Sequence, residues 1–207
     1  MKLVDMTVTG YLEDVQSDSP APGGGSVSAL SACQAASLVA MVCDLTMGKE
    51  KYAEYEEICK ETKEVMLELY KKLYVNVDAD TDAFIRVASA YKLPKDTDEL
   101  KAIRSKAIRE ANVGATEVPF NTVELSLQGL KAMKKMYGKY NSNCDSDFGV
   151  AALSFMTGAY GAWLNVKINL PGVKDEELQK KFESAYDMMK EAEKICNEIY
   201  FGIEANL

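Results

Sequence analysis

Two long stretches of the chain carry no charged residue, one from Ser26 to Cys43 and the other from Phe148 to Val166. Both are rich in small residues, which let a neighbouring helix approach closely. We therefore predict two buried helices, from Ser26 to about Met47 and from Asp147 to Leu170, that pack against each other. The first stretch approaches transmembrane length, but its serines and glutamine favour a buried helix of a soluble protein. The small residues are Ser28, Ala32, Ala36 and Ala40 in the first helix and Ala151, Ala152, Gly158, Ala159 and Ala162 in the second.

The rest of the chain shows the apolar spacing of amphipathic helices, with no β pattern. We expect helices over residues 8–15, 51–93, 97–117, 118–138 and 175–201, the second of them ending before Pro94 and the third broken at Pro119. Thr7 and Thr97 are placed to cap two of these helices. The predicted fold is all-α, a single domain over residues 1–207 that forms one bundle of about seven helices.

Two uncharged helices are more than a single small bundle usually places at its centre. The surplus apolar surface must be covered by something other than the chain's own helices. We therefore predict a homodimer closed by two-fold symmetry.

Composition narrows the partners of the protein. The chain has 32 acidic and 24 basic residues and a net charge of −8, which disfavours nucleic acid and anionic membranes and favours a small-molecule ligand. Its five cysteines show no metal-binding spacing, so we expect reduced, mostly buried thiols. The N-terminal residues lack the apolar core of a signal peptide, which agrees with a cytoplasmic location.

The chain contains no histidine. This absence removes histidine-based triads, histidine zinc sites and histidine general bases. Any catalytic chemistry must therefore come from aspartate, glutamate, lysine, tyrosine, cysteine or backbone groups.

The segment from Pro20 to Ser26 leads the backbone into the first uncharged helix through Pro-Ala-Pro and three glycines. Gly23, Gly24 and Gly25 permit positive φ and leave no side chain in the way of an approaching group. A helix that begins here presents free N–H groups that suit a carboxylate, a phosphate or a polarised ring oxygen, with Ser26 as a further donor. The segment is neither a Walker A loop nor a dinucleotide fingerprint. A flexible linker is the alternative.

Asp78, Asp80 and Asp82 lie two residues apart on a predicted helix, so they cannot all point the same way. Phe84, Ile85 and Ala88 mark the expected inward stripe, which brings Asp80 close to an apolar face. Burial raises the pKa of a carboxyl group into the range useful for proton transfer. A solvated turn or a helix cap is the competing interpretation.

A polar loop also precedes the second uncharged helix. Ser146 or Asp147 can cap that helix, and Asp147 can instead supply a carboxylate at the mouth of a pocket, with Asn141, Asn143 and Ser146 as hydrogen-bonding neighbours. If the two uncharged helices lie side by side, the groups at their starts can line one pocket. Asn165 and Asn169 are amides on an otherwise apolar helix, and they either bind substrate or satisfy nearby backbone groups.

The run PAPGGGSVSAL resembles the signature of the formiminotransferase-cyclodeaminase and methenyltetrahydrofolate cyclohydrolase family. Further blocks similar to that family follow in order over nearly the whole chain, which looks like a free-standing cyclodeaminase domain. Tyr140 departs from the pattern, because glycine is expected there, and it changes the wall of the expected pocket. The further blocks are LTMGKEKY, DADTDAF, LPK, ATEVPF, NSNCDSDFGVAA and NVKINL.

The resemblance implies an all-helical homodimer that acts on one-carbon derivatives of tetrahydrofolate without metal or nucleotide cofactor. Either 5-formiminotetrahydrofolate loses ammonia to give 5,10-methenyltetrahydrofolate, or water opens 5,10-methenyltetrahydrofolate to 10-formyltetrahydrofolate; we favour the cyclodeaminase slightly. Asp147 and Asp80 are the expected proton-handling carboxylates. Lys95 and Arg104 are candidates to bind the glutamate tail, with ordinary surface solvation as the alternative.

Overall fold

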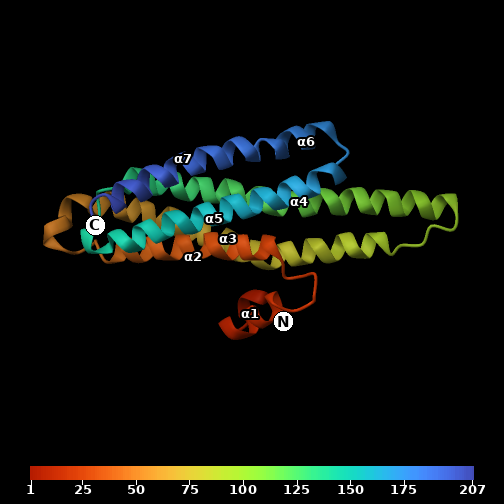
Figure 1. Ribbon diagram of the computed structural model, residues 1–207, viewed down its shortest axis with the longest axis horizontal. Coiled ribbons are helices and arrows are strands. Elements are labelled where there is room, and N and C mark those ends of the chain that lie inside the picture. The colour runs from red at the N-terminus through yellow and green to blue at the C-terminus, as the bar shows by residue number, and fades with distance from the viewer.

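The computed structural model describes residues 1–207 as an elongated helical bundle without strands (Figure 1), which confirms the all-α prediction. Four short 3-10 helices connect or precede the α-helices: η1 (Leu3–Asp5), η2 (Glu50–Tyr55), η3 (Ser142–Cys144) and η4 (Leu170–Gly172). The α-helices are α1 (Val8–Val15), α2 (Gly24–Asp44), α3 (Glu56–Tyr91), α4 (Asp98–Met136), α5 (Asp145–Asn169), α6 (Glu176–Glu183) and α7 (Ala185–Glu204).

The two uncharged helices, α2 and α5, pack side by side as the small residues predict. They run antiparallel, because the start of α2 lies near the end of α5: a β-carbon built on Gly24 would lie 3.4 Å from Asn165 Nδ2. At the crossing, a β-carbon on Gly158 would lie 2.8 Å from that of Ala32. Only glycine allows this approach, so the contact depends on the sequence of α5.

α2 is the one helix whose length and composition would allow it to cross a membrane. However, α2 packs along its length against α3 and α5, and Ala32, Ala35, Val39 and Val42 are fully buried. α2 is therefore a core helix of the bundle, as predicted.

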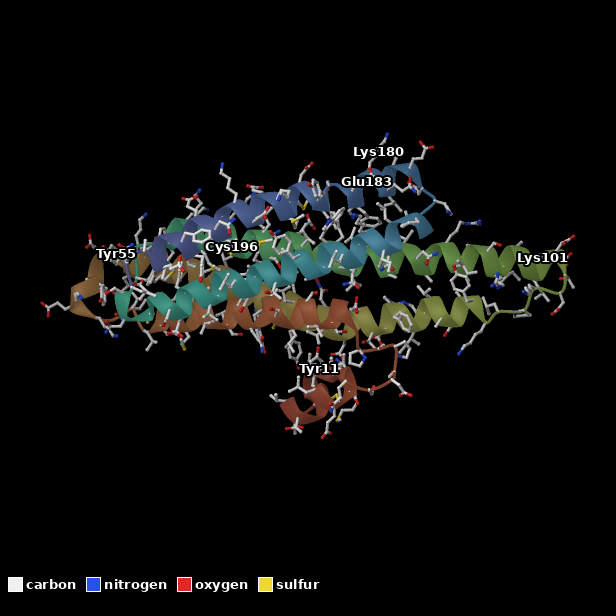
Figure 2. The ribbon with its side chains drawn as sticks, in the orientation of Figure 1. Tyr11, Tyr55, Lys101, Lys180, Glu183 and Cys196 are labelled. Atoms are coloured by element: carbon white, nitrogen blue, oxygen red, sulfur yellow. The ribbon has the colours of Figure 1, made fainter.

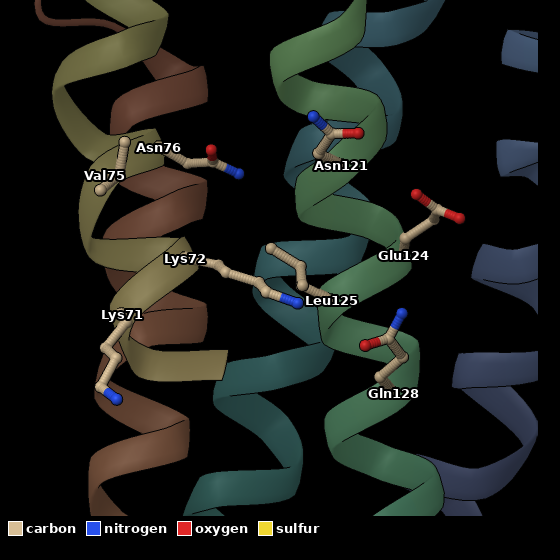
Figure 3. Close-up of a pocket in the computed structure, with 8 residues that line it drawn as sticks. All are labelled: Lys71, Lys72, Val75, Asn76, Asn121, Glu124, Leu125 and Gln128. Carbon is tan, nitrogen blue, oxygen red and sulfur yellow. The ribbon is translucent and has the colours of Figure 1, made fainter. Parts of the chain in front are cut away.

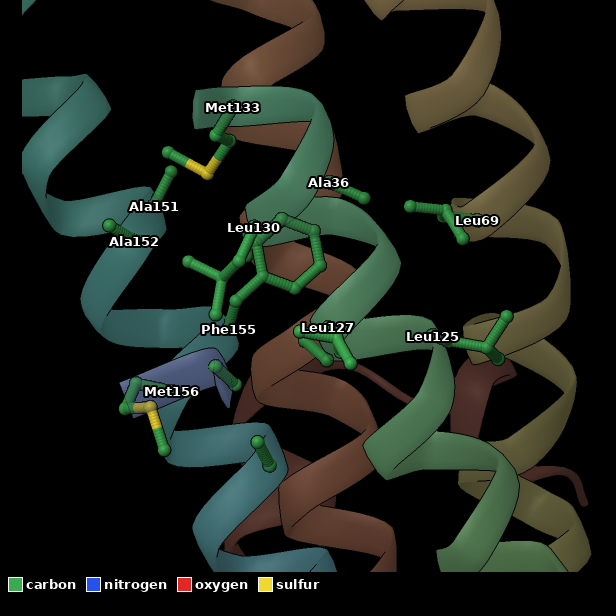
Figure 4. Close-up of a cluster of buried hydrophobic side chains, with 14 of the residues drawn as sticks. Ala36, Leu69, Leu125, Leu127, Leu130, Met133, Ala151, Ala152, Phe155 and Met156 are labelled. Carbon is green, nitrogen blue, oxygen red and sulfur yellow. The ribbon is translucent and has the colours of Figure 1, made fainter. Parts of the chain in front are cut away.

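The core continues between α4 and α5 (Figure 4). Phe155 is fully buried against Gly129, where a β-carbon would lie 2.3 Å from the ring, and Leu130 and Met133 pack around it. All five cysteines are buried and free. Burial raises the pKa of Cys33 and Cys196 to about 11 and that of Cys43 to about 12, so these thiols stay protonated at neutral pH, as expected of inert cysteines.

The predicted break at Pro119 is wrong, because α4 continues through it. Proline has no N–H to donate to the carbonyl of Ala115, which would be its partner in the helix. Asn169 Nδ2 donates to that carbonyl instead, at 2.8 Å. A side chain from α5 thus replaces the missing backbone bond and lets the helix continue.

Other helix limits also differ from the prediction. α2 begins at Gly24 and ends at Asp44, and the helix expected from residue 51 begins at Glu56, after η2. The single C-terminal helix is divided at Ser184, whose hydroxyl donates to the carbonyl of Lys181 at 2.6 Å and competes with the helical ladder.

α3 and α4 form a hairpin that extends beyond the other helices (Figure 1, yellow and green). The predicted inward stripe is wrong there, since Phe84 and Ile85 are 42% and 53% exposed. Ala83 and Ala90 are buried instead. These alanines let the two helices approach closely, and no third layer covers the outer side chains.

α1 lies outside the bundle, beside the start of α2 (Figure 1), and Thr7 caps it by accepting a hydrogen bond from Gly10 N–H, both as predicted. Leu3 N–H donates to Asp78 Oδ1 at 2.6 Å and ties the N-terminal segment to α3. Thr97 accepts from Leu100 N–H and caps α4.

The close crossing of α2 and α5 predicts opposite effects for two glycine-to-alanine changes. Gly158→Ala should destabilise the protein by about 1–3 kcal/mol, because its β-carbon has no room. Gly114→Ala should stabilise it by roughly 0.5–1 kcal/mol, because a β-carbon on this residue of α4 meets nothing within 4 Å and alanine favours a helix. Urea unfolding of the two variants measures both effects; equal effects would contradict the crossing geometry.

Candidate functional site

The predicted glycine segment and the predicted carboxylate meet at the start of α2. Ser26 N–H donates to Asp80 Oδ2 at 3.0 Å, although the two residues belong to different helices. A β-carbon on Gly25 would lie 2.0 Å from Asp80 Oδ1. The carboxylate of Asp80 therefore occupies the space that the glycine leaves free.

The hydroxyl of Ser26 fixes this junction from the other side. It donates to the carbonyl of Val77 at 2.8 Å and lies 3.2 Å from the hydroxyl of Thr81 and 3.5 Å from Asp80 Oδ2. Ser26 is fully buried. The side chain thus holds one turn of α3 against the first turn of α2.

Burial raises the pKa of Asp80 above its ordinary value, and the hydrogen bonds from Ser26 oppose part of this shift. No lysine or arginine pairs with Asp80 in any of the chain's ion pairs. Its negative charge is therefore stabilised only by hydrogen bonds and by the positive end of α2. Such a carboxylate can exchange protons more readily than an exposed aspartate.

Tyr11 lies where α1 meets the bundle (Figure 2). Its side chain is 8% exposed, and its hydroxyl is the one buried side-chain polar atom without a hydrogen-bond partner. Burial and, secondly, the charge of Asp80 raise the pKa of Tyr11. Tyr11 also lines an apolar hollow of about 470 Å³ between α1 and α2.

The prediction that Gly23, Gly24 and Gly25 are needed for positive φ is wrong, whereas the predicted close approach is found at Gly25. Positive φ is found at Gly48 and Gly138, whereas Gly23 is extended, with φ −125°. The helix already includes Gly24 and Gly25, whose N–H groups have no acceptor in the chain. Position 25 requires glycine because the carboxylate of Asp80 lies where a β-carbon would be.

Asn165 and Asn169 lie on the last two turns of α5, near this end of the bundle. Asn165 Nδ2 donates to the carbonyl of Gly161 at 2.9 Å and faces the start of α2 at Gly24. Asn169 Nδ2 donates a hydrogen bond to the carbonyl of Ala115. Of the two predicted uses of these amides, the structure shows the satisfaction of backbone groups.

The second predicted group lies at the opposite end of the bundle. Asn141 N–H donates to Thr46 Oγ1 at 3.0 Å, and Asn141 Nδ2 donates to the carbonyl of Leu45 at 3.1 Å, just beyond the end of α2. The prediction that both helix starts line one pocket is therefore wrong within a single chain, because α2 and α5 are antiparallel. Along α2, about 30 Å separate Ser26 from Thr46.

The predicted capping of α5 by Ser146 or Asp147 is also wrong. α5 begins at Asp145, so both residues fall in its first turn, and no side chain caps the helix. Asn141 caps η3 instead, by accepting from Asn143 N–H. Tyr140, the departure from the expected pattern, is buried and stacks on Phe148 with ring centroids 4.3 Å apart.

Lys95 and Arg104 lie near the tip of the α3–α4 hairpin, about 16 Å or more along α3 from Asp80. The guanidinium of Arg104 donates to the carbonyl of Tyr91 at 3.2 Å and lies over its ring. Lys95 is exposed and Arg104 is half-buried, and their role with a folate tail stays a prediction.

A separate groove of about 490 Å³ lies between the middle parts of α3 and α4 (Figure 3). Lys72 extends across it toward Leu125, and Asn76 Nδ2 donates to Thr122 Oγ1 at 3.1 Å. None of the predicted site residues lines this groove. The junction at Asp80 is therefore the stronger candidate.

Comparison with known proteins identifies the family of the chain. The sequence profile described as formiminotransferase-cyclodeaminase matches residues 7–188. The chain belongs to this family. Four of the stretches that resemble the family form two groups in space: PAPGGGS meets DADTDAF at the start of α2, and LTMGKEKY meets NSNCDSD at its end.

Two relatives in the family differ in length. The methenyltetrahydrofolate cyclohydrolase of Methylorubrum extorquens is 36% identical over 202 residues, 97% of each chain. The formimidoyltransferase-cyclodeaminase of Mus musculus is 34% identical over 179 residues, 86% of this chain and 33% of that protein. The chain thus spans about a third of the second relative.

The solved structure of a formiminotetrahydrofolate cyclodeaminase from Thermotoga maritima matches with a TM-score of 0.83. The match covers 96% of this chain and 98% of that chain at 24% identity, which shows the shared fold.

Sequence reasoning missed several parts of the junction. Thr81 could have been found, because it lies inside the DADTDAF block, whereas nothing in the sequence marks the carbonyl of Val77. The sequence spacing places Tyr11 on the apolar face of α1, and only the three-dimensional structure shows its unpaired hydroxyl.

The contact between Gly25 and Asp80 predicts unequal effects for two changes in the glycine run. Gly25→Ala should displace the carboxylate and lower kcat for folate substrates roughly 10²–10⁴-fold. Gly23→Ala is the matched control and should retain activity, because its β-carbon would have an ordinary contact of 3.7 Å with the carbonyl of Pro20. Steady-state kinetics together with circular dichroism measure both; equal loss in both variants would contradict the assignment.

The contact between Asn169 and the carbonyl opposite Pro119 predicts a coupled effect on stability. Asn169→Ala should destabilise the protein by about 1–3 kcal/mol, because it leaves a partly buried carbonyl unpaired. In the Pro119→Ala background the same change should cost less, because residue 119 then has an N–H for that carbonyl. Urea unfolding of the four proteins measures the coupling. Additive effects with a raised KM would instead indicate that Asn169 binds substrate.

Proposed function

We propose that the protein is a folate one-carbon enzyme, a formiminotetrahydrofolate cyclodeaminase that converts 5-formiminotetrahydrofolate to 5,10-methenyltetrahydrofolate and ammonia. The observation that carries this proposal is the partly buried carboxylate of Asp80 at the start of α2, next to unoccupied backbone donors, in a chain of this family. The pocket needs no histidine for this chemistry.

The chemistry fits a single carboxylate with a raised pKa. N10 of the substrate attacks the formimino carbon, a tetrahedral carbon forms between N5 and N10, and ammonia leaves. Asp80 takes the proton released by the attacking nitrogen and returns it to the leaving nitrogen. Its negative charge also stabilises the cationic character of the reacting carbon.

The first turn of α2 supplies the binding groups. The N–H groups of Gly24 and Gly25 have no acceptor in the chain, and they can donate to the polar edge of the pterin. Asn165 lies beside Gly24 and offers a further polar group. Asp147, with Asn141, Asn143 and Ser146, is the second proposed group of the site.

Methenyltetrahydrofolate cyclohydrolase is the second candidate, and a specific observation favours it: the relative with that name matches this chain over 97% of both lengths. Water then takes the place of N10 as the nucleophile and attacks the methenyl carbon. Asp80 accepts a proton of that water and gives it to N5 as the bond between that carbon and N5 breaks. The remaining hydroxyl loses its proton to solvent as the formyl group forms, so the same groups serve both reactions.

We further propose that the enzyme works in the cytoplasm as a homodimer, without metal or nucleotide cofactor and without nucleic acid or membrane partners. Five buried free thiols support a reducing compartment. Exposed apolar residues on α2 and α5, among them Val27, Met41 and Leu164, support self-association.

Absorbance of methenyltetrahydrofolate tests the activity, with 5-formiminotetrahydrofolate and 5,10-methenyltetrahydrofolate supplied separately. We expect turnover of at least one substrate and a loss of roughly 10²–10⁴-fold in Asp80→Asn. Since the ionised carboxylate is the base, kcat/KM should fall as pH drops through a pKa above the ordinary 3.8.

Stability provides the control for this variant. Because the pKa of Asp80 is raised in the folded state, its contribution to stability is present below its unfolded pKa and is lost as pH rises through the folded pKa. Asp80→Asn should therefore melt at or above the wild-type temperature at pH 7, and this difference should shrink in acid. Inactivity of the wild type on both folates would refute the function.

A further inference from the structure

The packing of α1 does not explain the hydroxyl of Tyr11. The residue is 8% exposed where α1 meets the bundle (Figure 2), and its hydroxyl is the one buried side-chain polar atom that finds no hydrogen-bond partner in the chain. Burying a hydroxyl that makes no hydrogen bond costs free energy, and phenylalanine would fill the same apolar space without this cost. The hydroxyl therefore points to a partner outside the chain.

Asp80 has an unpaired atom as well. Its Oδ2 accepts from the N–H of Ser26 at 3.0 Å and lies 3.5 Å from the hydroxyl of the same residue. Its Oδ1 accepts no hydrogen bond from any group of the chain, although a carboxylate oxygen can accept two. Oδ1 is therefore available to a bound molecule.

Tyr11 lies beside this carboxylate. Leu3 N–H donates to Asp78 Oδ1 at 2.6 Å and holds the segment that leads into α1 against α3. Tyr11 and Val77 line the same hollow of about 470 Å³, and Val77 lies one turn before Asp80 on α3. Burial and, secondly, the charge of Asp80 raise the pKa of Tyr11, so the phenol keeps its proton at neutral pH and acts as a donor.

We infer that Tyr11 is a further catalytic residue, whose hydroxyl and Asp80 Oδ1 together hold the water molecule that attacks the methenyl carbon of 5,10-methenyltetrahydrofolate. A water molecule fits both unpaired atoms, because it accepts a hydrogen bond from the phenol and donates one to the carboxylate. The inference rests on the function proposed above and assigns hydrolysis to this site as an activity in its own right.

These two contacts leave the second lone pair of the water free to attack. As its oxygen bonds to the methenyl carbon, one proton of the water passes to Asp80 Oδ1. Asp80 gives that proton to N5 when the bond between the carbon and N5 breaks, and the hydroxyl on the carbon loses its proton to solvent as the formyl group forms. Tyr11 keeps its own proton and orients the water throughout.

Direct contact between Tyr11 and the folate is the alternative. The two folates share the pterin ring and the atoms N5 and N10, so such a contact would serve both reactions equally. A held water serves hydrolysis alone, because in cyclodeamination N10 supplies the attacking lone pair. The two arrangements therefore differ in which reaction depends on the hydroxyl.

Kinetics of Tyr11→Phe on the two folates separate these arrangements. Hydrolysis of 5,10-methenyltetrahydrofolate should lose roughly 10²-fold in kcat with KM little changed, because the water is no longer oriented. Cyclodeamination of 5-formiminotetrahydrofolate should fall far less. Tyr160→Phe is the matched control and should keep both rates, because its hydroxyl donates to Glu193 of α7. Equal loss with both folates, unchanged hydrolysis in Tyr11→Phe, or a wild type that cyclodeaminates but does not hydrolyse would overturn the inference.

Melting temperatures test the held water without folate. If water joins the phenol to the carboxylate, Tyr11→Phe should lower the melting temperature more in the wild type than in Asp80→Asn, where the water has lost its charged acceptor. Equal shifts in the two backgrounds would overturn the inference. If the shifts differ but the wild type turns over neither folate, the water site stands and the proposed function fails.

Discussion

The close approach of α2 and α5 is the constraint on which the rest of the structure depends. At Gly158 and Gly161 the two helices leave no room for a β-carbon, because Ala32, Ser28 and the backbone fill it. Packing at this distance holds the two helices in antiparallel order along the stretches 26–43 and 148–166, which carry no charge. The order in turn decides which polar groups share an end of the bundle, and so separates Asp147 from Asp80.

At the start of α2, two influences act in opposite directions on the ionisation of Asp80. Asp80 satisfies the N–H of Ser26 and so acts as a cap supplied by another helix, a role that favours its ionised form. Burial opposes ionisation and raises its pKa. The balance leaves a carboxylate that is held in place yet able to exchange a proton, which is the property that one-carbon transfer requires.

The sequence predicted the helices well because charge-free stretches and threonine caps are local signals. It also singled out Gly25, Ser26 and Asp80, which the structure brings into contact. It failed where a distant residue decides: Asn169 rescues the helix at Pro119, and alanines 83 and 90 displace Phe84 and Ile85 from the inner face. The direction in which α5 runs relative to α2 cannot be read from either helix alone, so the single-pocket prediction failed for the same reason.

The hairpin of α3 and α4 gives the two longest helices uneven rigidity along their length. Near Asp80 they are braced by α2 and α5, but toward Tyr91 and Asp98 each has only the other to pack against. Opening of the tip exposes little apolar surface, so its amide hydrogens exchange through small local fluctuations, whereas those near Asp80 exchange only when most of the bundle opens. The same two helices therefore combine a firm support for the carboxylate of Asp80 with a compliant end a few turns away.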